Sequence, residues 1–207
     1  MKRIALVLAF AATFASAAQK VRLYGEAREV TTIPVFTNMD GFNPETNIGF
    51  TAAIGVQTPV NRQVLFDAHT GFFAARWGSS SEFYDSKITS YFQSIGAGFQ
   101  FHPTKVFGLG LGFAYDIALD NSVSDEYTGP GPAPADDNSD ESLKDKNVAL
   151  AEFGAAVKVS RHLDIVGTYR LPLTEYSSNK DSKIKLHQIN IGLRYTFNAK
   201  SQIEAVE

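Results

Sequence analysis

The sequence predicts an all-β protein that folds as an eight-stranded antiparallel up-and-down transmembrane β-barrel. Three observations predict this fold: an N-terminal leader typical of export, period-two alternation along the rest of the chain, and short connections that alternate with long ones. After the leader, no run of 18 apolar residues remains, which excludes a helical membrane protein.

The leader has the layout of a secretory signal peptide. Lys2 and Arg3 are positively charged, residues 4–14 are almost entirely apolar, and Ala15, Ser16 and Ala17 form a small-x-small cleavage pattern. The apolar run is shorter than the roughly 20 residues of a membrane-spanning helix. We therefore expect three parts: a removed signal peptide (1–18), the barrel (19–197) and a short polar tail (198–207).

Composition excludes several classes of function. The 207 residues contain no cysteine, so there is neither a disulfide framework nor a thiolate metal site. The formal net charge is -3, and removal of Lys2 and Arg3 makes it about -5, without the basic face of a nucleic-acid-binding protein. We expect no cofactor, no metal and no nucleic-acid partner.

Eight segments alternate between apolar and small or polar residues. In the segment that begins at Val106, Leu109, Leu111 and Phe113 share one face, while the intervening glycines share the other. Each segment has roughly 11–15 residues, longer than the 5–6 of soluble sheets and enough to cross a bilayer at a tilt. The predicted strands are 20–30, 46–58, 64–76, 88–102, 106–119, 148–160, 163–174 and 184–197.

The predicted connections differ in length in a regular way. The short ones are Pro59–Gln63, Pro103–Lys105 and Arg161–His162. The long ones are Thr31–Glu45, Trp77–Lys87, Asp120–Asn147 and Glu175–Lys183. Outer-membrane barrels have short periplasmic turns and longer outer loops, so we expect both termini in the periplasm.

Charged residues share the faces opposite to the apolar ones. A soluble barrel would bury these charges in its core at several kcal/mol each unless they were paired, whereas a membrane barrel directs them into its lumen. The cationic and anionic residues are nearly equal in number, which predicts mutual pairing that plugs the narrow bore. The predicted lumen network comprises Arg22, Glu26, Arg28, Asp67, Asp116, Glu152, Lys158, Arg170 and Arg194, with His69 left aside.

Aromatic residues gather near both ends of the predicted strands, as in the interfacial belts of membrane barrels. One belt would contain Phe66, Phe101, Phe107, Tyr195 and Phe197. The other would contain Trp77, Tyr91 and Tyr115.

The last predicted strand carries the most specific motif. Asn190, Gly192, Tyr195 and Phe197 follow the pattern polar, x, glycine, x, x, aromatic, x, aromatic. This motif resembles the terminal signal by which the barrel assembly machinery recognises its substrates. Together with the signal peptide and the eight strands, it makes the chain similar to the OmpA/OmpX-type outer-membrane β-barrel superfamily. Such chains usually end at the terminal aromatic residue, whereas residues 198–207 follow Phe197.

The resemblance implies an integral outer-membrane protein, a monomer in contact with lipid and lipopolysaccharide. We expect a non-enzymatic structural or surface-interaction role with a largely plugged lumen. A narrow porin-like channel for small solutes and a lipid A-modifying enzyme are the alternatives. The candidate Ser–His group for catalysis is His187 with Ser177, Ser178 and Ser182, and serine is common in loops. The acidic, proline-rich loop 120–147 does not match the EF-hand spacing for calcium.

Overall fold

The computed structural model describes residues 21–38, 41–130, 146–178 and 183–197. The predicted signal peptide (1–18), the tail (198–207) and most of the acidic loop lie outside the described residues. The strands are β1 (Arg22–Thr37), β2 (Asn43–Pro59), β3 (Val64–Ser80), β4 (Tyr84–Phe101), β5 (Phe107–Tyr127), β6 (Val148–Lys158), β7 (Leu163–Pro172), β8 (Ser177–Ser178) and β9 (Lys183–Thr196). Within the described part of the chain, no helix is long and apolar enough to span a membrane.

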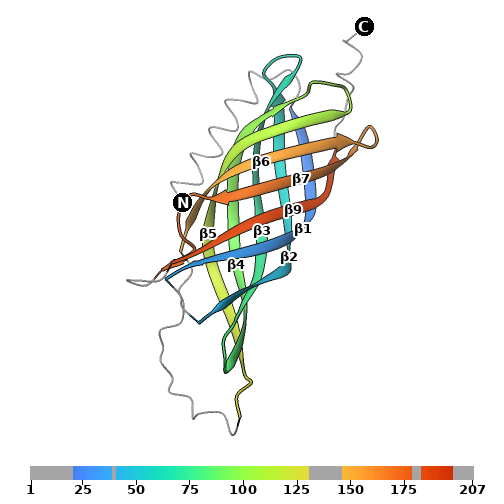
Figure 1. Cartoon of the computed structure of the whole chain (residues 1–207). Helices are drawn as coiled ribbons and strands as arrows, with labels where there is room; N and C mark the ends of the chain where they lie inside the picture. Colours follow the sequence, from blue (N-terminus) through green and yellow to red (C-terminus); the bar gives the residue numbers. More distant parts are fainter. Residues whose placement is uncertain (1–20, 39–40, 131–145, 179–182, 198–207) are drawn as a thin grey trace.

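Eight of these strands form a closed ring (Figure 1). Each strand from β1 to β7 pairs antiparallel with the next, β7 pairs with β9, and β9 closes the ring against β1, from Tyr24 opposite Thr196 to Thr37 opposite Lys183. The two-residue strand β8 only extends the edge of β9. The predicted all-β, eight-stranded, antiparallel up-and-down barrel is confirmed.

The two ends of the barrel differ. At the end where β1 begins and β9 finishes, called the terminal end below, the connections are 60–63, 102–106 and 159–162. At the opposite end, called the extended end, the first five strands continue well beyond their neighbours: β5 has 21 residues, but β7 has 10. The hairpin of β3 and β4 projects there, at the bottom of the view in Figure 1.

Two of the predicted long loops are therefore wrong. Most of Thr31–Glu45 belongs to β1 and β2, and most of Trp77–Lys87 belongs to β3 and β4, whose connection is only 81–83. The strict alternation of short and long connections fails for the same reason. Toward this end the inward residues are apolar as well, such as Phe36 and Trp77, so the alternation fades in the sequence while the backbone pairing continues.

The outer wall of the barrel carries an apolar belt. Along β5, Leu111 is 56% exposed and Phe113 is 65% exposed, whereas Gly112 and Ala114 turn inward and are buried. The same parity holds on β9, where Ile191 and Leu193 face outward. An apolar band exposed around a closed ring is the surface that a lipid bilayer covers.

The half of the lumen toward the extended end is filled by apolar side chains. Phe73, Phe92 and Tyr176 are almost completely buried, and the rings of Phe73 and Phe92 stack with centroids 5.1 Å apart. Trp77 also belongs to this cluster, at 2% exposure, and meets Phe36 edge-to-face. Its predicted place in an interfacial belt is therefore wrong, since Trp77 has the inward parity of β3.

Small residues allow the wall to curve tightly around this lumen. A Cβ atom on Gly112 would lie 2.9 Å from the carbonyl oxygen of Ala97 in β4, and one on Gly192 would collide with the carbonyl oxygen of Ala27 in β1. Strongly curved sheets use glycine at such inward positions, where neighbouring backbones approach most closely.

The apolar belt makes a testable prediction. Replacing Leu111 by Arg should lower the free energy of unfolding by about 2–4 kcal/mol, because it places a charge in the hydrocarbon region. Urea-dependent folding into lipid bilayers measures this change. The control is Val106→Arg in the connection before β5, where the cost at the interface is about 0–1 kcal/mol. Equal losses for the two variants would contradict the assignment of the belt.

Candidate functional site

Arg170 of β7 lies at the centre of a buried polar cluster in the lumen. Its Nη2 donates to Asp116 of β5 at 2.7 Å and to the Ser94 hydroxyl of β4 at 2.8 Å. Its Nε donates to Glu152 of β6 at 2.9 Å, and its Nη1 donates to Gln188 of β9 at 3.0 Å and to Asp116 at 3.2 Å. All five N–H groups of the guanidinium are therefore used.

Tyr176 connects this cluster with the apolar side of the lumen. Its hydroxyl donates to Asp116 at 3.3 Å and accepts from the Gln188 amide at 2.5 Å, while its ring packs edge-to-face on Phe92. Arg170 lies over the ring of Phe73, 5.3 Å from its centroid. The polar and apolar layers are thus in direct contact with each other.

A second cluster lies nearer the terminal end. Arg194 of β9 and Arg28 of β1 both donate to Glu26 of β1. Arg28 also donates to the Thr168 hydroxyl at 2.8 Å, and the guanidinium of Arg194 lies 4.4 Å from the centroid of the Tyr24 ring. One carboxylate therefore holds two guanidinium groups, and each of these has a further neighbour.

Asp67 of β3 extends the second cluster across the lumen. It accepts from the Tyr24 hydroxyl at 2.9 Å and from the Gln57 amide at 3.0 Å, and Arg194 lies 3.9 Å away. The Gln57 amide also donates to Gln100 of β4 at 2.9 Å. Side chains from β1, β2, β3, β4 and β9 thus meet at one level of the barrel.

His69 joins the two clusters. Its Nδ1 lies 3.2 Å from Asp67, and its Nε2 lies 3.6 Å from Glu152, which belongs to the Arg170 cluster. A cavity of about 70 Å³ opens beside it, lined by Arg28, Asp67, His69, Glu152 and Arg194 and walled by several glycines. This volume accommodates a few water molecules.

The other two predicted lumen residues lie at the terminal end. Lys158 of β6 pairs in register with Asp164 of β7, and Arg22 interacts electrostatically with the same carboxylate. Burial lowers the pKa of His102, in the connection after β4, and the charges of Arg22, Arg194 and Lys158 lower it further. This end of the lumen thus carries a local excess of positive charge.

The structure places all nine predicted lumen residues on inward-facing positions. Seven of them join the two clusters that His69 connects, and Arg22 and Lys158 lie apart with Asp164. The predicted network lacks the neutral members and leaves His69 and Asp164 out. The inward parity of all these residues is enough to assign them to the network, because a polar residue on an inward face needs a partner. The missed neutral members are Tyr24, Gln57, Ser94, Gln100, Thr168, Tyr176 and Gln188.

The residues of the terminal motif close the ring. Asn190 is buried on the inward face, and Gly192 lies against the backbone of β1. Tyr195 and Phe197 face outward with ring centroids 5.4 Å apart, and the Phe197 N–H donates to the Leu23 carbonyl at 2.9 Å. The motif therefore lies on the seam between β9 and β1.

The candidate catalytic histidine has a different partner. The Nδ1 of His187 lies 2.6 Å from the Tyr169 hydroxyl on the outer wall, while Ser182 and the side chains of Ser177 and Ser178 lie outside what the structure describes. Among the described residues, no group of histidine and carboxylate side chains is arranged to hold a metal ion.

Comparison with known proteins agrees with this geometry. The family model of the outer membrane protein beta-barrel domain matches residues 4–197. The chain belongs to this family. It is therefore an integral protein of the outer membrane. A search of curated protein sequences found no match.

Solved structures of other outer-membrane barrels resemble this family member. Neisserial surface protein A is 14% identical, with a TM-score of 0.50 over 86% of this chain and 100% of its own. OprG from Pseudomonas aeruginosa is 11% identical, with a TM-score of 0.48 over 86% of this chain and 95% of its own. The outer membrane protease OmpT from Escherichia coli is 11% identical, with a TM-score of 0.44 over 87% of this chain and 97% of its own. At 14% identity, the similarity to Neisserial surface protein A shows the fold alone.

The Arg170 cluster predicts a large effect of a single substitution. Arg170→Ala leaves Asp116 and Glu152 buried without their cation, so the free energy of unfolding should fall by about 3–5 kcal/mol. Equilibrium folding into bilayers measures this loss. The control is Lys183→Ala, which removes an exposed ion pair with Glu175, whose pKa is lowered by the hydrogen bond from Lys183. This control should change stability far less, and an equal effect would contradict the buried network.

Proposed function

We propose that this outer-membrane barrel is non-enzymatic and serves a structural and surface-interaction role with a closed lumen. The observation that carries the proposal is the filling of the lumen by two layers. Apolar side chains around Phe73 and Trp77 pack toward the extended end, and the Arg170 cluster lies directly beneath them. A solute would have to displace both layers to pass.

The orientation follows the asymmetry of the two ends. We infer that the terminal end, with its short turns, faces the periplasm, and that the extended end faces the exterior, as in outer-membrane barrels generally. Both chain termini are then periplasmic after removal of the signal peptide. Insertion through the barrel assembly machinery and contact with lipopolysaccharide around the belt are parts of the same proposal.

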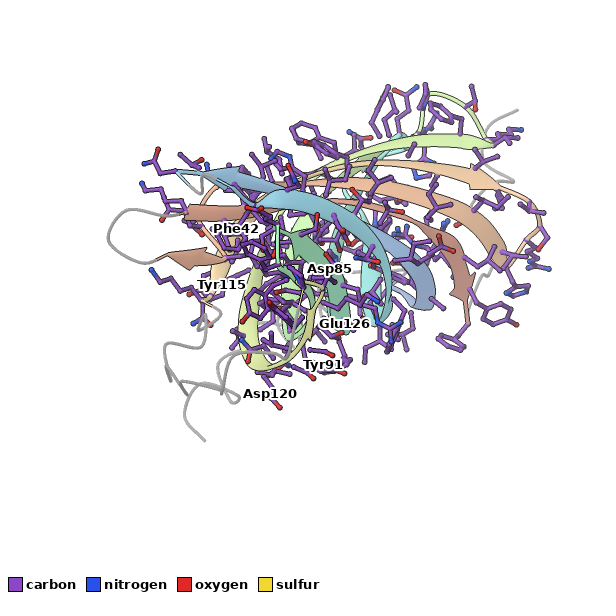
Figure 2. All side chains as sticks on the ribbon, turned by 60° about the horizontal axis from the view of Figure 1, so that its bottom comes forward. Phe42, Asp85, Tyr91, Tyr115, Asp120 and Glu126 are labelled. Carbon is purple, nitrogen blue, oxygen red and sulfur yellow. The ribbon has the colours of Figure 1, made fainter. Side chains whose placement is uncertain are left out.

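The projecting strands at the extended end supply the interaction surface (Figure 2). Phe42 is exposed in the connection between β1 and β2, and the rings of Tyr84 and Tyr127 meet edge-to-face, 5.3 Å apart. Asp85 and Glu126 lie directly opposite each other on β4 and β5. Exposed aromatic residues are typical of protein interfaces, and opposed carboxylates favour a partner with basic groups.

A closed lumen predicts the absence of ion flow. Purified protein in planar lipid bilayers should show no steady single-channel conductance, because no continuous water path crosses the apolar layer. A variant that opens both layers, with Phe73, Trp77, Phe92 and Arg170 replaced by alanine, is the positive control and should conduct. Steady conductance of the wild type would favour a narrow channel instead. A change in lipid A mass upon expression, absent with His187→Ala, would favour an enzyme.

The orientation makes a separate prediction. Protease added to intact cells should cut within the connection between β5 and β6, residues 128–147, and spare the turns at 60–63 and 102–106. Mass spectrometry of the released peptides identifies the cleavage sites. Lysed cells are the control for protease access to the spared turns. Cleavage at those turns in sealed cells would reverse the proposed orientation.

A further inference from the structure

Glu29 is a carboxyl group on the lipid-facing wall of the barrel. Its neighbours on β1, Arg28 and Val30, turn inward, whereas Glu29 is exposed. On the outward face it lies midway between Leu23 and Val35, both exposed residues of the apolar belt. Glu29 is therefore at the middle of the membrane-spanning surface, and not at an interface with water.

The surroundings of Glu29 are apolar. It is in register with Phe50 of β2 and Ile191 of β9, which are 49% and 61% exposed. The Glu29 side chain forms no hydrogen bond or ion pair with any residue that the structure describes. An ionisable group in the hydrocarbon region is costly and normally has a polar partner. The described residues of the barrel provide none, so a group from another molecule can fill this role.

A complementary polar group lies on the same wall. The Tyr169 hydroxyl of β7 and the Nδ1 of His187 of β9 are 2.6 Å apart on the outward face. Along β9, Tyr169 is in register with Ile189, two positions from Ile191, which is in register with Glu29. β9 lies between β1 and β7. The carboxyl group and the Tyr169–His187 pair therefore flank β9 at nearly the same level.

We propose that a second copy of this chain covers this wall, in a two-fold dimer centred on β9. A two-fold axis along the membrane normal exchanges the flanks, so β1 of each copy faces β7 of the other. Ile189, Ile191 and Leu193 form the apolar centre of the interface. Glu29 of each copy then meets the Tyr169–His187 pair of the other. This dimer replaces the monomer expected from the sequence.

In this dimer each hydrogen-bond donor of the Tyr169–His187 pair has an acceptor. His187 donates its Nδ1–H to the Tyr169 oxygen, and the Tyr169 hydroxyl donates its own hydrogen to the Glu29 carboxylate of the second copy. Both contacts occur twice, by symmetry. Polar contacts between membrane segments are worth about 0.6–1.7 kcal/mol each, so loss of two Tyr169–Glu29 contacts should weaken dimerisation about tenfold or more.

Disulfide cross-linking tests the dimer in native outer membranes, because the chain has no cysteine of its own. Ile191→Cys places a thiol at the centre of the interface, and oxidation should give a dimer on a non-reducing gel. The matched control is Ile95→Cys, exposed on the outer wall of β4, on the opposite side of the ring. Equal cross-linking of the two variants would overturn the proposal.

The polar contact is tested in the Ile191→Cys background. Glu29→Ala removes only an unpaired group from the lipid-facing wall, so the barrel should still assemble, while cross-linking falls about tenfold. Thr31→Ala, on the same face of β1, is the control and should leave cross-linking unchanged. Unchanged cross-linking with Glu29→Ala would refute the role of the carboxyl group.

Mixed copies separate a contact between chains from one within a chain. A Glu29→Ala copy and a Tyr169→Phe copy, carrying different tags, retain one of the two contacts when they pair with each other. Each variant alone retains none. Mixed dimers should therefore form more readily than either homodimer. Mixed dimers at or below the homodimer level would show that the two groups do not meet across an interface.

Discussion

The Arg170 guanidinium is the group on which the closed barrel depends. Its five N–H groups reach acceptors on β4, β5, β6 and β9, so a single side chain of β7 connects five of the eight ring strands across the lumen. Its flat face also contacts Phe73 of β3, at the border of the apolar layer. The charge is tolerated there because Asp116 and Glu152 compensate it and because every donor is satisfied.

The two layers of the lumen stabilise the barrel in different ways. The apolar layer around Phe73, Phe92 and Tyr176 packs buried rings against one another, as a soluble core does. The polar layer around Glu26, Asp67 and His69 fixes which strands lie opposite one another, because its hydrogen bonds are directional and leave a small cavity. Together they connect the strands of the ring across the lumen.

Much of this arrangement follows from sequence parity alone. Strand side chains alternate strictly, so the sequence is sufficient to assign Asp116, Glu152 and Arg170 to the lumen. Assigning a residue to a face by its type instead of its parity leads to errors. Tryptophan is typical of an interfacial belt, yet Trp77 faces inward. A prediction that considers only charges misses Gln57 and Gln100. The predicted strand ends are wrong because inward residues such as Phe36 and Trp77 are also apolar toward the extended end, so the alternation is lost while the backbone pairing continues.

For Glu29, strand parity determines which face of the barrel wall carries the side chain but not whether the side chain has a partner. The lumen charges lie on even-numbered positions of β1, as Glu26 and Arg28 do, so the odd number of Glu29 assigns it to the lipid-facing wall. Parity does not reveal whether a carboxyl group at that place has a partner, because the answer depends on strands far away in sequence. Only ring closure brings β9 beside β1, with β7 next to β9, and places Tyr169 and His187 on the same wall as Glu29. Glu26, Asp116 and Glu152 are paired by the barrel's own strands, whereas the Glu29 side chain has no partner among the described residues and would gain one in the proposed dimer.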